Sequence, residues 1–441
     1  MLLESNAAAH VRSVPQAAAQ VWHTAERPLK CLWIGRYIPY PMDAGAKVYS
    51  ARLAESLAAA GAMVRFTGFG DLSAVARDSR VDWRAVPNQP RGQLAALVSH
   101  LPVAAAVDST QSYKALLEEQ LHEDWDAIVL DGYAAGWALP RCIHYRAARE
   151  YRCAIVHVSH NHEAALWRSM ALEARSSIPK RLVLWQNYLK VRTLERRIAR
   201  SVDLLTAITD EDALALGGCL PHGRRLTLTP GYAGWVAPDD RISAAAPRRV
   251  IIVGSFRWVM KRENLARFVE VADPLFKRHN IVLDVVGDVA EELLAGLRKR
   301  CQAVQFHGFV DDVSQYLSQA RIAVVPELIG GGFKLKFLDY IFARVPVATL
   351  AQAAAGIPAQ LQQHMLLSGD LDELVNSIIV NIDKLDDLNR MQARAFACGE
   401  ALFRWEDRGQ QLHRAIAGLR QEFNAARPRS HRLADVSTSP S

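Results

Sequence analysis

The sequence lacks several features that define whole classes of protein. No run of 18 or more apolar residues occurs among its 441 residues, so a transmembrane helix is not expected. Its six cysteines form no C-x-x-C pair, which disfavours a zinc site or a disulfide framework and favours a reducing, cytoplasmic compartment. The first 27 residues lack the basic and then apolar order of a signal peptide, and we interpret them as a disordered tail.

Other absences narrow the choice of ligand. The net charge of +7 suits an anionic partner, whether this is a nucleotide, a phospholipid or a nucleic acid. No known nucleic-acid-binding module is recognisable, so a nucleic-acid partner is not expected. The loop after Gly35 reads Arg-Tyr-Ile-Pro instead of a close glycine series, which disfavours a dinucleotide-dependent oxidoreductase.

The two halves of the sequence repeat one plan, in which a buried strand is followed by a polar loop and a helix. In the first half, apolar runs end near Gly35, Tyr133 and Ser159, and a second series begins near residue 248. This alternation predicts an α/β fold of two Rossmann-like, doubly wound domains facing a central cleft. Ligands of such sheets bind beyond the carboxyl ends of the strands. We expect a disordered tail (1–27), an acceptor-side domain (28–235), a linker (236–247), a donor-binding domain (248–403), a C-terminal helix (404–425) and a second disordered tail (426–441).

The stretch PELIGGGFKLKFLDYIFARVPVATL (326–350) places three glycines before two lysines and an aspartate. A helix predicted from about Phe333 to Ala343 puts Lys334 in its first turn, where free N–H groups and a lysine charge suit a phosphate. Asp339, one turn after Lys336, would accept hydrogen bonds from ribose or sugar hydroxyls. The same pattern is typical of a packing loop that carries Lys336 and Asp339 as an exposed ion pair.

A second basic segment, GSFRWVMKREN (254–264), follows the first strand of the second half. Arg257 and Lys261 are expected in a loop at the carboxyl end of that strand. Taken alone, such residues are typical of a solvated surface. Together with the glycine loop, they fit opposite sides of one anion site.

Several motifs occur in a characteristic order: VGSFRW with Lys261 and Asn264, VVGD (285–288), FHGFVDDVSQYLSQARIAVVPE (306–327), GGGFKLKFLDYIFARVPV and AAAGIP (353–358). In this order they resemble the group 1 glycosyltransferases, a retaining family with the GT-B fold. The resemblance is close over residues 248–360 and looser over residues 29–235. It implies that the C-terminal domain binds a nucleoside diphosphate sugar. The donor-binding residues that it implies are Gly45, Gly254, Ser255, Glu327, Gly331, Gly332, Phe333, Lys334, Lys336 and Asp339.

The segment VHVSHNHE (156–163) ends a strand of the first half. A structural role is the simplest interpretation of any one of its histidines, and a metal site is disfavoured because the segment turns into a loop. By resemblance, His160 faces the donor sugar, and Asn161 and Glu163 lie on the acceptor side. His160, Arg257 and Lys261 are the catalytic candidates. The leaving diphosphate would take the acceptor proton, so no metal and no cofactor besides the donor substrate are expected.

Two departures from the family pattern bear on activity. Members commonly carry two acids eight positions apart, but here the first position is Gly331 and the second is Asp339, where glutamate is usual. Glu327 lies four residues upstream of the first position. The main hypothesis is a glycosyltransferase that moves a hexose to a saccharide or lipid-linked acceptor in bacterial polysaccharide or glycoconjugate synthesis. The alternative is a catalytically inert sugar-nucleotide-binding or scaffolding protein.

The segment Lys180–Arg200 is basic and apolar at helical spacing. Such a pattern is typical of a core helix with a solvated face, and equally of a surface that docks on anionic lipid. Peripheral contact with the inner face of a membrane is therefore a hypothesis for this cytoplasmic chain.

Overall fold

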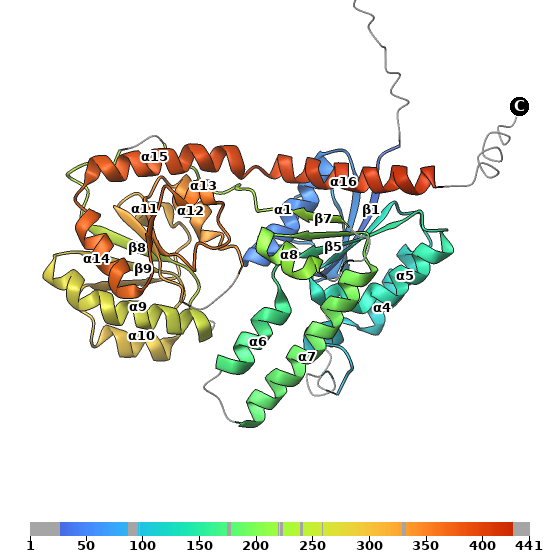
Figure 1. Cartoon of the computed structure of the whole chain (residues 1–441), viewed down its shortest axis with the longest axis horizontal. Helices are drawn as coiled ribbons and strands as arrows, with labels where there is room; N and C mark the ends of the chain where they lie inside the picture. Colours follow the sequence, from blue (N-terminus) through green and yellow to red (C-terminus); the bar gives the residue numbers. More distant parts are fainter. Residues whose placement is uncertain are drawn as a thin grey trace, which may run out of the picture.

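In the computed structural model, two domains lie side by side, each built on one parallel sheet (Figure 1). The described residues are 27–86, 96, 98–173, 178–218, 220, 224–238, 241–257, 259–328 and 332–426. The tails predicted at 1–27 and 426–441 lie outside these residues, except for Arg27 and Ala426. Of the predicted donor-binding residues, Gly331 also lies outside them.

The N-terminal sheet has seven strands in the order β3-β2-β1-β4-β5-β6-β7. They are β1 (Lys30–Tyr37), β2 (Met63–Phe69), β3 (Asp82–Val86), β4 (Ala127–Asp131), β5 (Ala154–Ser159), β6 (Leu204–Ala207) and β7 (Arg224–Thr227). The order reverses at β1, because β2 pairs on one side of this strand and β4 on the other. The central strands are almost continuously apolar, as parallel strands covered on both faces must be.

Alternating residues of β1 belong to two separate cores on the two faces of this sheet. Trp33 packs with α1 (Gly45–Ala59) and with the C-terminal helix α16 (Trp405–Ala425). Leu32 packs on the other face. The elements that contribute to this second core include α3 (Val103–Asp108), α4 (Gln111–Gln120), η1 (Tyr133–Ala138), α5 (Leu139–Ala148), α7 (Ile178–Ser201) and α8 (Asp210–Gly217). The doubly wound prediction is therefore confirmed for this half.

The C-terminal sheet has six strands in the order β10-β9-β8-β11-β12-β13. They are β8 (Arg249–Val253), β9 (Val282–Val286), β10 (Val304–Gly308), β11 (Ile322–Val325), β12 (Val347–Leu350) and β13 (Leu366–Ser368). The helices of this half are α9 (Val259–Arg278), α10 (Glu291–Arg298), α11 (Ser314–Leu317), α12 (Lys336–Phe342), α13 (Ala359–Gln362), α14 (Leu371–Asn381) and α15 (Leu385–Leu402). The order again reverses at the first strand, β8, which lies between β9 and β11.

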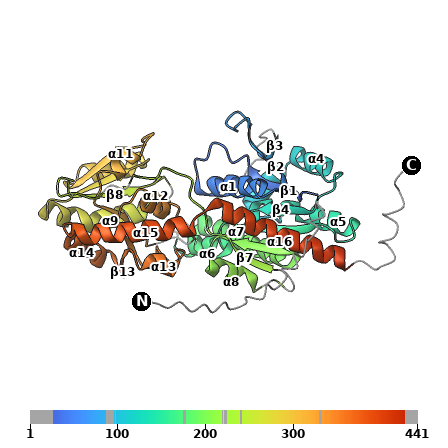
Figure 2. The ribbon, with the colours of Figure 1, turned by 90° about the horizontal axis from the view of Figure 1, so that it is seen from above.

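The last two helices span both domains, as seen from above in Figure 2. The α15 helix packs on the C-terminal domain, and the chain then returns so that α16 covers the N-terminal sheet. Leu412 and Ile416 of α16 are fully buried there. Gly409 permits the close approach of α16 to α1, because a Cβ atom at this position would lie 2.1 Å from the Ser56 carbonyl oxygen.

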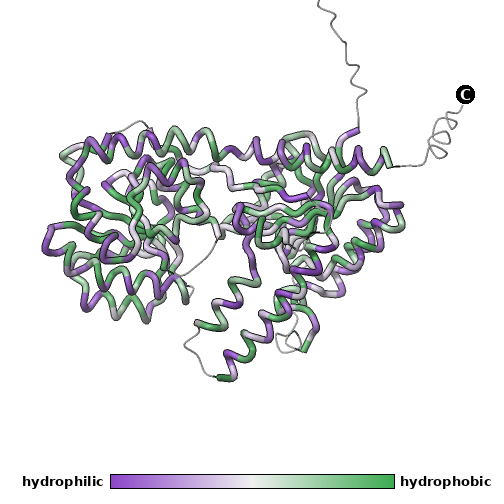
Figure 3. Tube along the Cα trace, in the orientation of Figure 1, coloured by the Kyte–Doolittle hydropathy of each residue, from purple (hydrophilic) through white to green (hydrophobic). Residues whose placement is uncertain are grey.

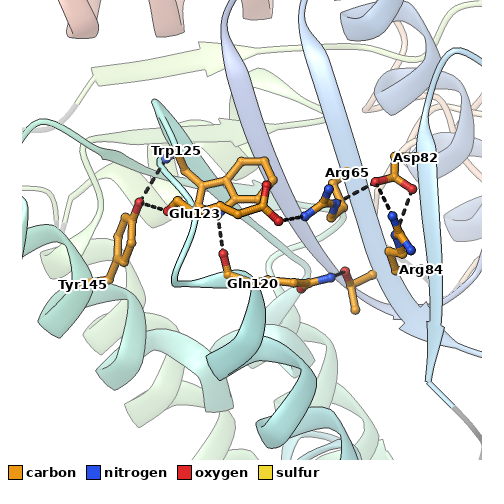
Figure 4. A network of polar contacts seen from close by, with 8 residues as sticks. Arg65, Asp82, Arg84, Gln120, Glu123, Trp125 and Tyr145 are labelled. Atoms are coloured by element: carbon orange, nitrogen blue, oxygen red, sulfur yellow. Dashed lines mark hydrogen bonds and ion pairs between the residues drawn. The ribbon is translucent and has the colours of Figure 1, made fainter.

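A polar network joins the start of the N-terminal sheet to the helices beside it (Figure 4). Arg65 of β2 pairs with Asp82 of β3 at 2.7 Å and also with Glu123. The Tyr145 hydroxyl donates to the Glu123 carbonyl oxygen at 2.7 Å and accepts from the Trp125 amide at 3.0 Å. These residues lie at the amino ends of the strands, so the network supports the sheet at the edge opposite the expected ligand site.

The hydropathy colouring of Figure 3 shows predominantly apolar strands inside both domains and mixed helices around them. The helix α6 (Glu163–Glu173) and α7 extend together away from the body of the N-terminal domain (Figure 1). Within the described part of the chain, no helix combines the length and the apolar character that a membrane span requires.

Candidate functional site

The two sheets present the carboxyl ends of their switch-point strands to the region where the domains meet. In the N-terminal domain, β4 ends at Asp131 and β5 is followed by His160. In the C-terminal domain, β8 is followed by Gly254 and β11 leads to Glu327. Doubly wound sheets bind ligands at such switch points, so a ligand site is expected at these residues.

Glu327 is the centre of a group of three lysines in the C-terminal domain. Lys336 Nζ lies 2.7 Å from Glu327 Oε1, and Lys334 Nζ lies 4.0 Å from Glu327 Oε2. Lys334 also donates to the Ala353 carbonyl oxygen at 3.1 Å. Lys261 interacts electrostatically with both Lys336 and Glu327. Three ammonium groups and one carboxylate leave two positive charges, so the group attracts anions.

The pKa values in this group reflect burial as well as charge. Burial lowers the pKa of Lys334 below its usual value, and the nearby Lys336 lowers it further, although Glu327 partly offsets both effects. Burial and Lys336 also lower the pKa of Lys261. Burial alone would raise the pKa of Glu327, but the two neighbouring lysines reverse this effect and lower it. Glu327 is therefore a salt-bridged carboxylate.

The helix that carries Lys336 differs from the prediction. It begins at Lys336 instead of near Phe333 and has only seven residues, so Lys334 precedes it. The attraction for an anion therefore comes from the lysine charges, and not from the N-terminus of a long helix. The alternative of an exposed ion pair between Lys336 and Asp339 is wrong, because Lys336 turns to Glu327 instead.

Asp339 is exposed to solvent on α12. Protein atoms around the carboxyl raise its pKa to about 6, although a hydrogen bond with Tyr232 and the charge of Lys336 oppose this shift. The Tyr232 hydroxyl also lies 2.8 Å from the Trp235 carbonyl oxygen, and its one hydrogen is donated to only one of these two acceptors at a time. Asp339 is thus placed to accept hydrogen bonds from a polar ligand.

The segment after β8 contributes one side of the lysine group. Gly254 lies beneath Lys336, whose Nζ would be 3.6 Å from a Cβ atom at this position, and Ser255 is exposed beside it. Lys261 was expected in a loop but lies in the first turn of α9, which begins at Val259. Arg257 is 76% exposed and pairs with Asp288. None of the interactions of the lysine group includes Arg257.

The glycine loop of the C-terminal domain touches the N-terminal domain. Gly332 has a φ of +72°, and a Cβ atom there would lie 2.3 Å from Asn161 Oδ1. A Cβ atom on Gly45, at the start of α1, would lie 3.2 Å from Leu335 Cδ1. Phe333 packs against the cores of both domains. The predicted donor loop is therefore brought against two residues that were predicted from the other half of the sequence.

His160 is held by an aspartate that the sequence analysis did not single out. His160 Nε2 lies 2.5 Å from Asp131 Oδ1, and Trp33 Nε1 donates to the second Asp131 oxygen at 2.8 Å. Burial lowers the pKa of His160, but Asp131 outweighs this effect and the pKa is raised. His160 Nδ1 is buried and has no hydrogen-bond partner among the described residues, so its hydrogen-bonding capacity is unused in this structure. The sequence signal that could have identified Asp131 is an acidic residue, directly before Gly132, at the end of a buried strand.

Asn161 and His162 connect His160 to α6, which begins at Glu163. Asn161 Nδ2 donates to Glu163 Oε1 at 3.2 Å. Burial raises the pKa of Glu163, while Asn161 and His160 oppose the shift. Glu195 of α7 accepts hydrogen bonds from the backbone amides of Glu163 and Ala164 at 2.9 and 2.8 Å. His157, by contrast, is buried within β5 with its Nδ1 atom 3.0 Å from the Leu130 carbonyl oxygen, which is a structural role.

The described residues contain no group of three histidine, cysteine or acidic side chains arranged to hold a metal ion. The chemistry that they do offer is positive charge from three lysines, the carboxyl of Asp339 and an oriented histidine from the opposite domain. Such a set suits a ligand with a diphosphate and a polyhydroxylated part.

Comparison with known proteins identifies similar sequences and folds. Residues 247–383 match the family described as "Glycosyl transferases group 1". The search of the curated proteins found no match. Sucrose-phosphate synthase from Thermosynechococcus elongatus has a similar structure, with a TM-score of 0.67, 17% identity and coverage of 90% of this chain and 100% of that chain. HepE of Anabaena, solved with UDP and glucose, has a TM-score of 0.58, 16% identity and coverage of 88% and 100%.

The two parallel α/β domains define a GT-B fold, as predicted. The family match over the C-terminal domain, which contains the whole lysine group, is more specific. Over residues 247–383, the chain is thus similar to the group 1 glycosyltransferases.

Proposed function

We propose that this enzyme transfers a hexose from a nucleoside diphosphate sugar to a saccharide or lipid-linked acceptor, with retention of the anomeric configuration. The observation that carries the proposal is the group formed by Lys261, Lys334 and Lys336 around Glu327. Uridine is the first base to test, because HepE has also been solved with UDP-glucose. Synthesis of a bacterial polysaccharide or glycoconjugate is the setting that we propose.

In this proposal the lysines hold the diphosphate, and Gly254 lets it approach the backbone at the end of β8. Transfer breaks the bond between the anomeric carbon and a phosphate oxygen, and a bond to the acceptor oxygen forms on the same face of the sugar. The acceptor proton passes to the departing diphosphate. The lysine charges stabilise the negative charge that grows on that group, which is the main contribution the protein has to make.

We propose that Asp339 and His160 position the sugar nucleotide from opposite domains. Asp339 would accept hydrogen bonds from hydroxyl groups, since its carboxyl lies one helical turn beyond Lys336. His160 would use its free Nδ1 atom, since Nε2 is engaged by Asp131. Asn161 and Glu163 continue from His160 and would face the acceptor. Arg257, paired with Asp288 on the surface, would reach the donor only after leaving that partner.

An inert, sugar-nucleotide-binding protein is the second candidate, and one observation favours it. The first acid of the family pattern is replaced by Gly331, and the nearby Glu327 is engaged by Lys336, so it does not supply a free carboxylate in its place. The two candidates differ in turnover and not in binding.

A panel of UDP- and GDP-sugars tests both candidates. We expect one donor to raise the melting temperature of the protein and to be consumed, either by transfer to an acceptor or by slow hydrolysis. Binding without any turnover across plausible acceptors would support the inert candidate. Absence of binding to every donor would contradict both.

A further inference from the structure

The α6–α7 hairpin carries an apolar stripe that no other part of the described chain covers. Ile178, Leu182, Trp185 and Leu189 follow one another at helical spacing on one face of α7. Their exposed fractions are 74%, 65%, 41% and 43%. The opposite face, which includes Tyr188 and Val191, is buried against the domain. The stripe is therefore not a core face, and its side chains stand in water on an element that projects from the molecule (Figure 1).

The same face becomes basic as it approaches the body of the domain. The spacing of the stripe continues from Leu189 to Arg192 and Arg196, both of which are exposed. Leu182 and Arg192 are separated by about 15 Å along the helix axis. The α7 sequence contains seven basic residues and one acid, Glu195, which is buried and bonded to backbone amides. On this face, an apolar stripe followed by two arginines matches the polarity gradient from the hydrocarbon of a bilayer to its headgroups, and the exposed Lys180 and Arg181 beside the stripe are long enough to reach the headgroups.

A cavity lies at the level of these arginines. It has a volume of about 260 Å³, and Arg168 of α6 lines it together with Arg192 and Arg196. No ion pair with a described residue neutralises any of these three guanidinium groups. The fork of an arginine matches the oxygens of a phosphate, so the cavity suits a phosphate-bearing headgroup.

We propose that the α6–α7 hairpin docks the enzyme on an anionic lipid bilayer. The apolar stripe enters the boundary between headgroups and acyl chains, and the arginine-lined cavity binds headgroup phosphates. Because α6 starts at Glu163, directly after His160 and Asn161, docking also places the acceptor side of the site at the membrane surface. This last consequence rests on the proposed function, whereas the docking itself does not depend on any donor chemistry.

Flotation of the full-length protein with lipid vesicles, without any sugar nucleotide, tests the proposal. The vesicles are phosphatidylcholine alone and phosphatidylcholine with about 30% phosphatidylglycerol. We expect flotation with the anionic vesicles and little with the neutral ones. The double variant Leu182→Ser/Trp185→Ser should reduce binding at least about tenfold, since two apolar side chains no longer enter the lipid.

Matched controls lie in the other domain. Phe309→Ser/Val380→Ser removes two side chains that are 78% and 60% exposed, and it should float like the wild type. Arg192→Glu/Arg196→Glu should abolish flotation, whereas Arg298→Glu/Lys299→Glu changes the net charge equally and should reduce it much less. Circular dichroism melting establishes that each variant is folded.

Three results would overturn the proposal. One is failure of the wild type to float with anionic vesicles. A second is an equal loss of binding in the hairpin variants and their controls, which would mean general charge attraction. Third, if the wild type instead self-associates and Leu182→Ser/Trp185→Ser makes it monomeric without any effect on vesicles, the stripe is a protein interface. Donor binding measured in the same variants separates this result from a failure of the proposed enzymatic function.

Discussion

Lys336→Met separates a role in binding the donor phosphate from a role in packing. The substitution keeps most of the length of the side chain and removes the ammonium group that lies 2.7 Å from Glu327. A hydrogen bond to a charged group contributes about 1.5 to 3 kcal/mol. If Lys336 binds the diphosphate, its loss should lower kcat/KM by about 10- to 150-fold. Stability should also fall, by about 1 to 3 kcal/mol, because Glu327 keeps only the weaker interactions with Lys334 and Lys261.

A second variant, Glu327→Gln, separates the effect of losing the Lys336 charge from the effect of breaking its ion pair with Glu327. It removes the carboxylate but leaves the charge of Lys336 available, so we expect kcat/KM to stay within about threefold of the wild-type value. The double variant should regain stability and keep the defect in kcat/KM. The assay is donor turnover at subsaturating donor, together with urea unfolding of each variant. Full recovery of kcat/KM in the double variant, or no loss in Lys336→Met, would refute the assignment of Lys336 to phosphate.

Three further predictions follow from other parts of the molecule. Asp131→Asn should lower the pKa of His160 in an NMR titration and reduce kcat at least about tenfold. In the wild type, the raised pKa of His160 adds to the free energy of unfolding at low pH, where the histidine is protonated. This contribution is lost as the pH rises through the pKa of His160, and the variant should show no such loss. Gly332→Ala places a side chain at positive φ against the facing domain and should destabilise the protein by about 1 to 2 kcal/mol, whereas Gly296→Ala, with open space around it, should be neutral or stabilising. Burial raises the pKa of Glu195 from 4.5 to about 8, so the folded state binds this proton more tightly and the unfolding free energy falls as the pH rises between these values. Glu195→Gln should remove that slope in urea unfolding, and an unchanged slope would contradict it.

Local patterns predicted most of the strands and helices that position the site. Apolar runs such as AIVLD and RVIIV became β4 and β8, because a central parallel strand is buried on both faces and shows an uninterrupted hydrophobic signal. The edge strand β7 was missed, since its sequence RRLT is half charged and only partly buried. The start of α12 was placed too early, because Leu335 continues the apolar spacing although the helix begins at the next residue.

The contacts within the site could not be predicted from local sequence patterns, because they depend on how the chain folds in three dimensions. Glu327 and Lys336 are nine residues apart, and only the return of the chain after β11 brings them together. Asp131 and His160 meet because β4 and β5 are neighbours in the sheet, which is a pairing of strands that no local pattern specifies. The periodicity of α7 likewise identified a helix but left open which apolar side chains are buried. The fold resolved this, since it buries Val191 and exposes Trp185.

The most direct test of the donor site is a calorimetric titration with UDP, UMP and uridine, repeated with the corresponding guanosine compounds. We expect the diphosphate of one base to bind at least about tenfold more tightly than its monophosphate, because the lysines around Glu327 engage the second phosphate. We also expect this difference to disappear in Lys334→Met/Lys336→Met. Equal affinity for the diphosphate and the monophosphate, or a difference that survives in the double variant, would refute the assignment of these lysines to the diphosphate.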